Sequence, residues 1–196
     1  MSEDLDVESS QIKDVYAQYG LAMYLAQCLE HGIVLGLIYA KLLPDELGMP
    51  RTAGPDSIRA FEKRFDVFMD EHFEMTMGAL FSRLQKTATL PSTFDVEFTK
   101  ARKLRNFLAH SYFRERAEDF ISKAGRTAML AELEEAQKLF ARIDDELTAA
   151  ARSLARAAGL ELTKQEHRVA EYLATAYARA SARDAAAAST TSKFKT

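Results

Sequence analysis

The residues best suited to chemistry are Arg105, Asn106 and His110, which fall in one short segment, Arg-Asn-Phe-Leu-Ala-His. Asn106 is the only asparagine in the 196 residues. Its short amide competes with a helix backbone for hydrogen bonds, so a helix that contains it needs a use for the side chain. Residues four apart lie on one face of a helix, so we expect Asn106 to hold the ring of His110. A histidine that transfers protons, beside the planar cation of Arg105, suits a phosphodiester substrate.

Positive charge gathers around this segment. From Thr99 to Arg116 there are six lysines and arginines against one acidic residue, Glu115. The net charge of the whole chain is −3, so any contact with nucleic acid has to be local. The candidates for substrate binding are the neighbours of the motif, Arg102 and Lys103 for phosphate and Tyr112 for stacking on a base.

Two plainer interpretations of the same residues stay open. His110 is also the kind of residue that a helix C-terminus favours, because its charge interacts well with the helix dipole. A run of basic residues is also the ordinary composition of a solvated helix face.

The elements that position these residues are all predicted to be helices, because apolar residues recur at steps of three and four. We expect an all-α fold, an antiparallel bundle of four to five helices over residues 10–158. The predicted helices cover about 10–43, ended by Pro44; 56–86; 92–110, begun by a Ser92–Asp95 capping box; and 113–158, bent near Gly125 and ended by Gly159. A C-terminal helix within 159–188 extends the bundle, and residues 1–9 and 189–196 are predicted to be disordered.

Helical geometry predicts which way the motif faces. The third helix should bury Leu108, and His110 and Asn106 each lie about 160° round the helix from it. Both therefore point away from the core of their own protomer. The first helix is apolar on nearly every face, which predicts a second subunit against it and hence a homodimer.

Composition limits the other possibilities. One cysteine, Cys28, excludes an intrachain disulfide, and the acidic start lacks the features of a signal peptide, so we expect a cytoplasmic protein. The apolar stretch 19–43 is interrupted by Gln27, Glu30, His31 and Lys41, which favours a buried helix over a membrane span.

No metal or cofactor site is predicted. The pairs Glu30–His31 and Glu71–His72 lack the Glu-x-x-His spacing of a di-iron bundle, and a single cysteine gives no zinc motif. Glu30 or His31 either lines the same cleft as His110 or forms a structural polar pair. The segment 162–169 resembles the start of a helix-turn-helix but has no recognition helix after it.

The motif Arg105-Asn106-Phe107-Leu108-Ala109-His110, followed by Ser111-Tyr112-Phe113, resembles the signature of the HEPN superfamily of small α-helical proteins. The resemblance covers residues 10–158. Many members are metal-independent ribonucleases of toxin–antitoxin and antiviral systems, and their motif lies in a cleft between two protomers. The resemblance therefore implies RNA, a second copy of the chain and an antitoxin protein as partners.

These observations together predict a metal-independent endoribonuclease whose catalytic residues are Arg105, Asn106 and His110, at a homodimer cleft. The alternative is a catalytically inactive helical dimer of the same fold, which binds RNA or protein.

Overall fold

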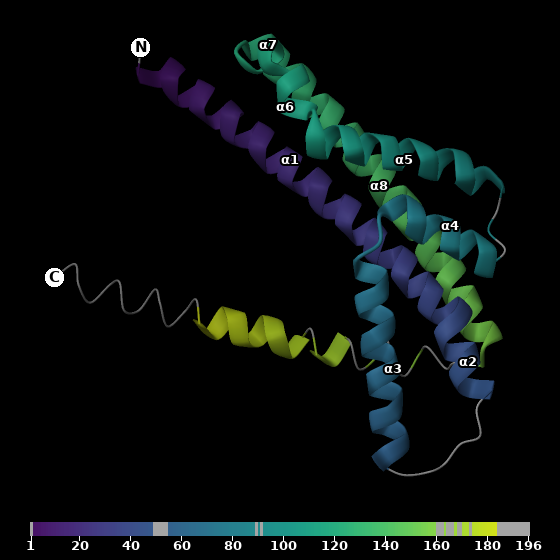
Figure 1. Cartoon of the computed structure of the whole chain (residues 1–196). Helices are drawn as coiled ribbons and strands as arrows, with labels where there is room; N and C mark the ends of the chain where they lie inside the picture. Colours follow the sequence, from purple (N-terminus) through teal and green to yellow (C-terminus); the bar gives the residue numbers. More distant parts are fainter. Residues whose placement is uncertain are drawn as a thin grey trace. The chain divides into compact units, whose positions relative to one another are not determined.

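The computed structural model describes residues 2–48, 55–88, 90, 92–159, 163, 167, 170–172 and 174–183, and it divides into two units, 1–154 and 155–196. Every regular element in the described residues is a helix, which confirms the all-α prediction (Figure 1). The elements are α1 (Ser2–Leu37), the π-helix η1 (Ile38–Leu42), α2 (Leu43–Gly48), α3 (Pro55–Phe73), α4 (Met77–Thr87), α5 (Ser92–His110), α6 (Tyr112–Glu115), α7 (Ala117–Phe120) and α8 (Lys123–Ala157).

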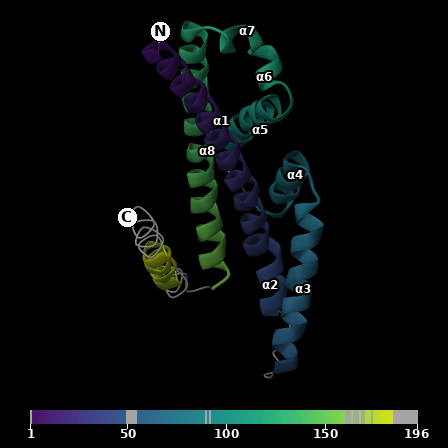
Figure 2. The ribbon, with the colours of Figure 1, turned by 90° about the vertical axis from the view of Figure 1, so that its left-hand side faces the viewer.

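The long helices α1 and α8 lie side by side and run in the same direction (Figures 1 and 2). Near the start of both, the Gln11 amide donates to the Thr127 hydroxyl at 3.0 Å. Further along, the Gln137 amide donates to the Gln18 carbonyl at 2.9 Å. Helix α5 runs antiparallel to both α1 and α8, so the bundle contains one parallel pair of long helices and is only partly antiparallel.

A break between α3 and α4 explains this difference from the predicted antiparallel bundle. Residues 56–86 were predicted as one helix, but the helix ends at Phe73 and a new one begins at Met77. Thr76 caps the new helix, since its hydroxyl accepts from the Ala79 amide at 3.3 Å. If residues 56–86 formed one helix, α5 would run in the same direction as α1. The break adds one reversal, so α8 returns parallel to α1.

The core lies between α1, α4, α5 and α8. The apolar residues of α8 follow the predicted three-and-four spacing from Leu133 to Leu147, and all of that stripe is buried. Helix α5 contributes apolar residues at the same spacing, with Leu104 half-buried and the others buried: Phe94, Phe98, Ala101 and Leu108. The largest fully buried side chains include Leu29, Ile33, Leu37, Leu84, Phe98, Leu108, Tyr112, Phe140, Ile143 and Leu147.

Pro44 does not end the first helix as predicted, because a π-turn precedes it. A proline inside an α-helix removes one hydrogen bond and crowds the carbonyl four residues earlier. Here the Leu43 amide donates to the Ile38 carbonyl, five residues back, so the backbone is already widened where the proline ring lies. The helical path therefore continues through Pro44 to Gly48.

The ends of the chain were predicted less well than the bundle. Helix α1 begins at Ser2, so the predicted disorder of residues 1–9 is wrong from Ser2 onward. Gly159 ends α8 as predicted, with φ of +78°. The described residues within 163–183 are helical, whereas the predicted tail 189–196 lies outside the described residues.

The start of α8 approaches α7 closely enough to test by substitution. A Cβ added to Gly125 would overlap the Asp119 carbonyl, whereas one added to Gly20 on α1 would meet nothing within 4 Å. We expect Gly125→Ala to destabilise the protein by about 2–4 kcal/mol, because backbone has to move. Gly20→Ala should be neutral or stabilising by up to about 1 kcal/mol. Thermal unfolding followed by circular dichroism measures both, and equal melting temperatures would contradict the close approach.

Candidate active site

The exposed face of α5 carries a polar stripe made of Arg102, Lys103, Asn106 and His110. Leu108, on the opposite side of the helix, is only 2% exposed. The structure thus confirms the direction predicted for His110 and Asn106, which point away from the core of their own chain. His110 is the last residue of α5, and within the described residues its ring has no hydrogen-bond partner.

The C-terminal end of α5 is fixed to α1. The Tyr19 hydroxyl donates to the Leu108 carbonyl at 3.0 Å, which occupies a carbonyl that the helix end leaves open. The Tyr19 ring packs on Tyr112 and Phe113, with ring centroids 5.8 and 4.9 Å away. The turn before His110 is therefore attached to α1, whereas the His110 ring makes no hydrogen bond among the described residues.

Arg105 leaves the stripe toward α1 and meets Glu30. Its Nη2 lies 3.0 Å from Glu30 Oε1, and both side chains are largely buried, with 30% and 23% exposed. At that distance Arg105 and Glu30 form an ion pair. The buried Glu30 Oε1 nevertheless has no hydrogen bond, because the guanidinium N–H of Arg105 is not directed at it. Glu30 was expected either to line the cleft of His110 or to form a structural polar pair. The structure shows a polar pair, and its partner is Arg105 of the motif.

Asn106 contacts Arg105 rather than His110. Arg105 Nη1 donates to Asn106 Oδ1 at 3.4 Å, a long hydrogen bond between neighbouring residues. The expectation that Asn106 holds the His110 ring is therefore wrong in this structure. Glu30 and Asn106 both contact the guanidinium of Arg105, and neither contacts the His110 ring in the described residues.

Tyr112 is not available for base stacking. The residue is 1% exposed, and its hydroxyl donates to the Met129 carbonyl at 3.3 Å. Burial raises the pKa of the Tyr112 phenol, and the nearby Glu132 carboxylate raises it further. The predicted stacking role is contradicted, because Ser111 starts a turn that directs Tyr112 into the core.

Four of the six basic residues around the motif are paired with acids, Lys100 and Arg114 with near neighbours in the sequence and Arg105 and Arg116 with acids from α1 and α8. Lys100 forms an ion pair with Glu97 at 2.9 Å. The hydrogen bond from Lys100, and a second one from Arg142, lower the pKa of the Glu97 carboxyl below its usual range. Arg116 makes two hydrogen bonds to Glu132, at 2.9 and 2.7 Å.

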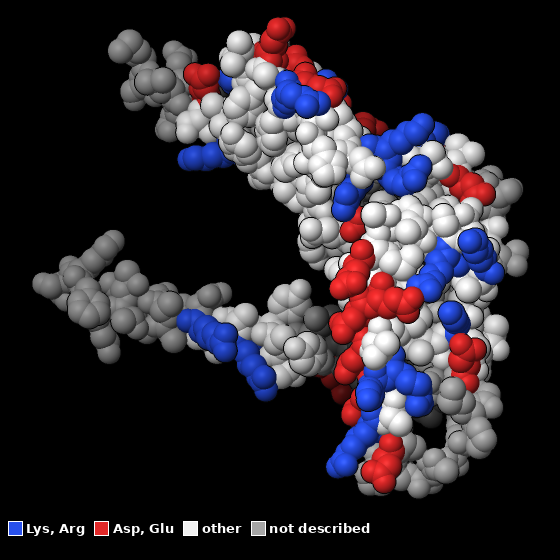
Figure 3. Space-filling model, in the orientation of Figure 1, with Lys and Arg blue, Asp and Glu red and all other residues white. Residues whose placement is uncertain are grey.

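Arg102 and Lys103 are different, since neither has an ion pair among the described residues. Figure 3 shows positive side chains gathered over α5. The positive field available to a phosphate is therefore narrower than the sequence suggested and lies on the exposed stripe itself.

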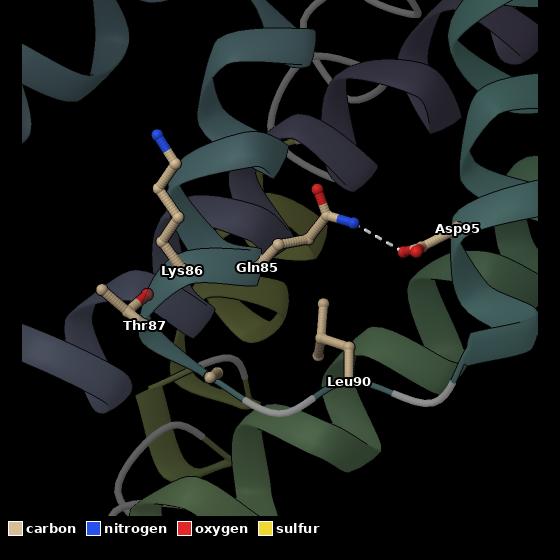
Figure 4. Close-up of a pocket in the computed structure, with 6 residues that line it drawn as sticks. Gln85, Lys86, Thr87, Leu90 and Asp95 are labelled. Atoms are coloured by element: carbon tan, nitrogen blue, oxygen red, sulfur yellow. Dashed lines mark hydrogen bonds between the residues drawn. The ribbon is translucent and has the colours of Figure 1, made fainter.

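The pocket drawn in Figure 4 does not belong to this site. It lies between the end of α4 and the start of α5, where Gln85 donates to Asp95 at 2.7 Å. Asp95 and His110 are 15 residues apart on one helix, which is about 22 Å. The pocket and His110 are thus at opposite ends of α5.

The Glu71–His72 pair, which was not predicted to bind a metal, makes structural contacts. His72 is 1% exposed, and its Nδ1 donates to the Phe68 carbonyl at 2.6 Å. Arg83 donates to its Nε2 at 3.1 Å and pairs with Glu71 at 2.9 Å. In the described part of the chain, no group of three or more histidine, cysteine, aspartate or glutamate residues is placed to hold a metal ion.

By length and composition alone, the helical stretch Glu8–Asp45 could cross a membrane. Within its most apolar 18 residues, 39% is buried inside the protein. Core helices of soluble proteins pass the same test.

No family model, curated protein or solved structure matches this chain.

Proposed function

We propose that the protein is a metal-independent endoribonuclease of the HEPN type, acting in a toxin–antitoxin or antiviral role in the cytoplasm. The observation that carries the proposal is the exposed stripe of α5, where the accessible His110, with no hydrogen bond among the described residues, ends the helix that also carries Arg105. General acid–base catalysis needs a histidine that is accessible and has no competing hydrogen bond. Stabilisation of a phosphorane needs a cation at the phosphate, and Arg105, which lies between Glu30 and Asn106, is the cation of the motif.

The proposed reaction is an internal transfer within the RNA. One His110 accepts the proton of a 2′-hydroxyl, and that oxygen forms a bond to the adjacent phosphorus. The bond from phosphorus to the 5′-oxygen breaks, and the 5′-oxygen takes a proton from the partner's His110. The products are a 2′,3′-cyclic phosphate and a 5′-hydroxyl. Arg105 contacts the phosphate oxygens as negative charge develops on them.

The dimer in this proposal has support on α1. Tyr16, Leu21 and Tyr24 are 54%, 43% and 60% exposed. They lie at the level of Tyr19, whose hydroxyl reaches the last turn of α5 before His110. A second protomer packed on these side chains would cover α1 at the axial level of the last turn of α5. Leu29, by contrast, is fully buried in its own chain, so it is not available to the interface.

We expect the protein to be a dimer at micromolar concentration and Leu21→Lys to be a monomer, because a charge at the centre of a desolvated interface is strongly unfavourable. Light scattering gives the mass of each. Ala17→Lys, on the same exposed face, should weaken the dimer less, since a smaller contact is lost. A wild-type monomer would remove the shared-site mechanism.

The test of the reaction uses RNA with a single 2′-deoxy position at the cleaved bond. We expect the unmodified RNA to be cut in EDTA, leaving a 2′,3′-cyclic phosphate, and the deoxy RNA to be bound but not cut. Loss of cleavage in EDTA with recovery in magnesium, or cutting of the deoxy RNA, would contradict the mechanism.

A second candidate function is a silent dimer that binds RNA or protein. The pairing of Lys100, Arg105 and Arg116 with acids favours it, since it leaves Arg102 and Lys103 as the cations of the stripe without an ion pair in the described residues. RNA that is bound and never cut would establish this candidate instead.

A further inference from the structure

A groove of about 420 Å³ lies between α1, α3 and α8. None of its lining residues belongs to α5, so it is separate from the proposed active site. Its floor is apolar, formed by the buried Val34 and Ile38 with Met69. At its rim, Leu35 and Phe73 are 39% and 52% exposed. Large apolar side chains left exposed around a groove are typical of a surface that binds a partner.

One wall of the groove carries a carboxylate. A Cβ added to Gly32 would lie 2.7 Å from Asp144 Oδ1, so the carboxylate lies directly over the bare backbone of α1. Burial raises the pKa of Asp144, and the neighbouring Asp145 raises it further. Asp144 has no ion pair within the described residues. A cation brought into the groove would therefore relieve the cost of burying this charge.

Further acidic residues stand on both sides. Asp66 and Asp70 flank Met69 on α3, and Asp145 follows Asp144 on α8; all three are exposed and have no ion pair in the described part of the chain. Figure 3 shows acidic side chains gathered where α3 meets α1. The groove is thus apolar inside and negative at its edges.

The shape of the α1 wall favours a helix as the occupant. Cys28, His31 and Leu35 line the groove at spacings of three and four, which is the spacing of a helix-packing seam. The His31 ring lies 5.5 Å from the Phe73 ring, edge to face, and so continues the apolar surface from α1 to α3.

We propose that this groove binds an amphipathic helix of a partner protein, with aliphatic residues on one face and lysine or arginine along the edges. A second copy of the chain fits less well, because a two-fold pairing would bring the two acidic rims together and like charges across an interface repel. The proposal does not depend on ribonuclease activity, since none of the groove residues is in the α5 stripe.

The experiment uses a fluorescein-labelled helical peptide about three heptads long, with leucine at positions a and d and lysine at e and g. We expect saturable binding to the whole protein by fluorescence anisotropy. Asp144→Asn and Leu35→Ser should each weaken it by about tenfold or more. The matched controls are Glu146→Gln, an exposed acid on another face of α8, and Val96→Ser, an exposed apolar residue on α5; both should bind as the wild type does.

A second readout reports occupancy directly. Cys28 is the only cysteine and lines the groove, so bound peptide should slow its alkylation by iodoacetamide. His110→Ala should bind the peptide normally, which separates this result from the proposed reaction. Three results would overturn the proposal. Asp144→Asn could bind the peptide as tightly as Glu146→Gln does, or a peptide with glutamate in place of lysine could bind equally well. Leu35→Ser could also be a monomer where the wild type is a dimer, which would make the groove a dimer interface.

Discussion

Replacing His110 by alanine should lower RNA cleavage by about a thousandfold, since the residue serves as base in one protomer and as acid in the other. The same change should leave the free energy of unfolding within about 0.5 kcal/mol of wild type. The ring is exposed and makes no hydrogen bond in the described structure, so its removal costs no packing. Cleavage is measured with a labelled RNA, and stability by chemical unfolding.

His167→Ala is the matched control, because His167 is also exposed but lies in the C-terminal unit. It should cleave as the wild type does. If His110→Ala loses activity only together with its fold, the residue is structural. If it stays folded and cleaves at the wild-type rate, His110 is not the acid–base group and the binding-module function is favoured.

The second large effect is expected at Arg105. Arg105→Lys keeps the charge beside Glu30 but loses the planar pair of donors, so we expect kcat to fall by about a hundredfold while the protein stays folded. Arg105→Ala also leaves the Glu30 carboxylate largely buried without a cation. We therefore expect it to cost about 1–3 kcal/mol of stability in addition.

Glu30→Gln separates positioning from charge. The variant keeps a polar group beside Arg105 but frees the guanidinium, so its kcat should fall while its pH profile, set by His110, stays unchanged. Full activity in Arg105→Lys would show that charge alone suffices. A pH profile that moves in Glu30→Gln would show that Glu30 acts on His110 rather than on Arg105.

The sequence predicted the helices that have regular apolar spacing. The stripes of α5 and α8 and the outward direction of His110 all follow from three-and-four periodicity, which fixes which face of a helix is buried. The same sequence did not predict the break at Thr76, because apolar residues keep helical spacing across it. The available signal was Thr76, a residue type that caps helix N-termini, two residues before Gly78.

Contacts between residues that are distant in the sequence cannot be predicted from the periodicity of apolar residues. The neutralisation of the basic cluster depends on Glu30 from α1 and Glu132 from α8, which approach α5 only once the bundle forms. Tyr112 shows the same limit. It is two residues from His110, yet the turn at Ser111 places it in the core instead of at the site.

The π-turn at Ile38–Leu42 has a consequence for how this chain compares with others. A π-turn holds about one residue more than an α-turn, so it acts as a one-residue insertion within a continuous helix. A chain with the same number of residues but a regular α-helix here would rotate everything after Leu42 by about 100°, whereas a chain one residue shorter at this point would keep both flanks in register. Related sequences aligned here should therefore show a single-residue gap near Tyr39, and deletion of one residue at this place should be tolerated better than anywhere else along α1.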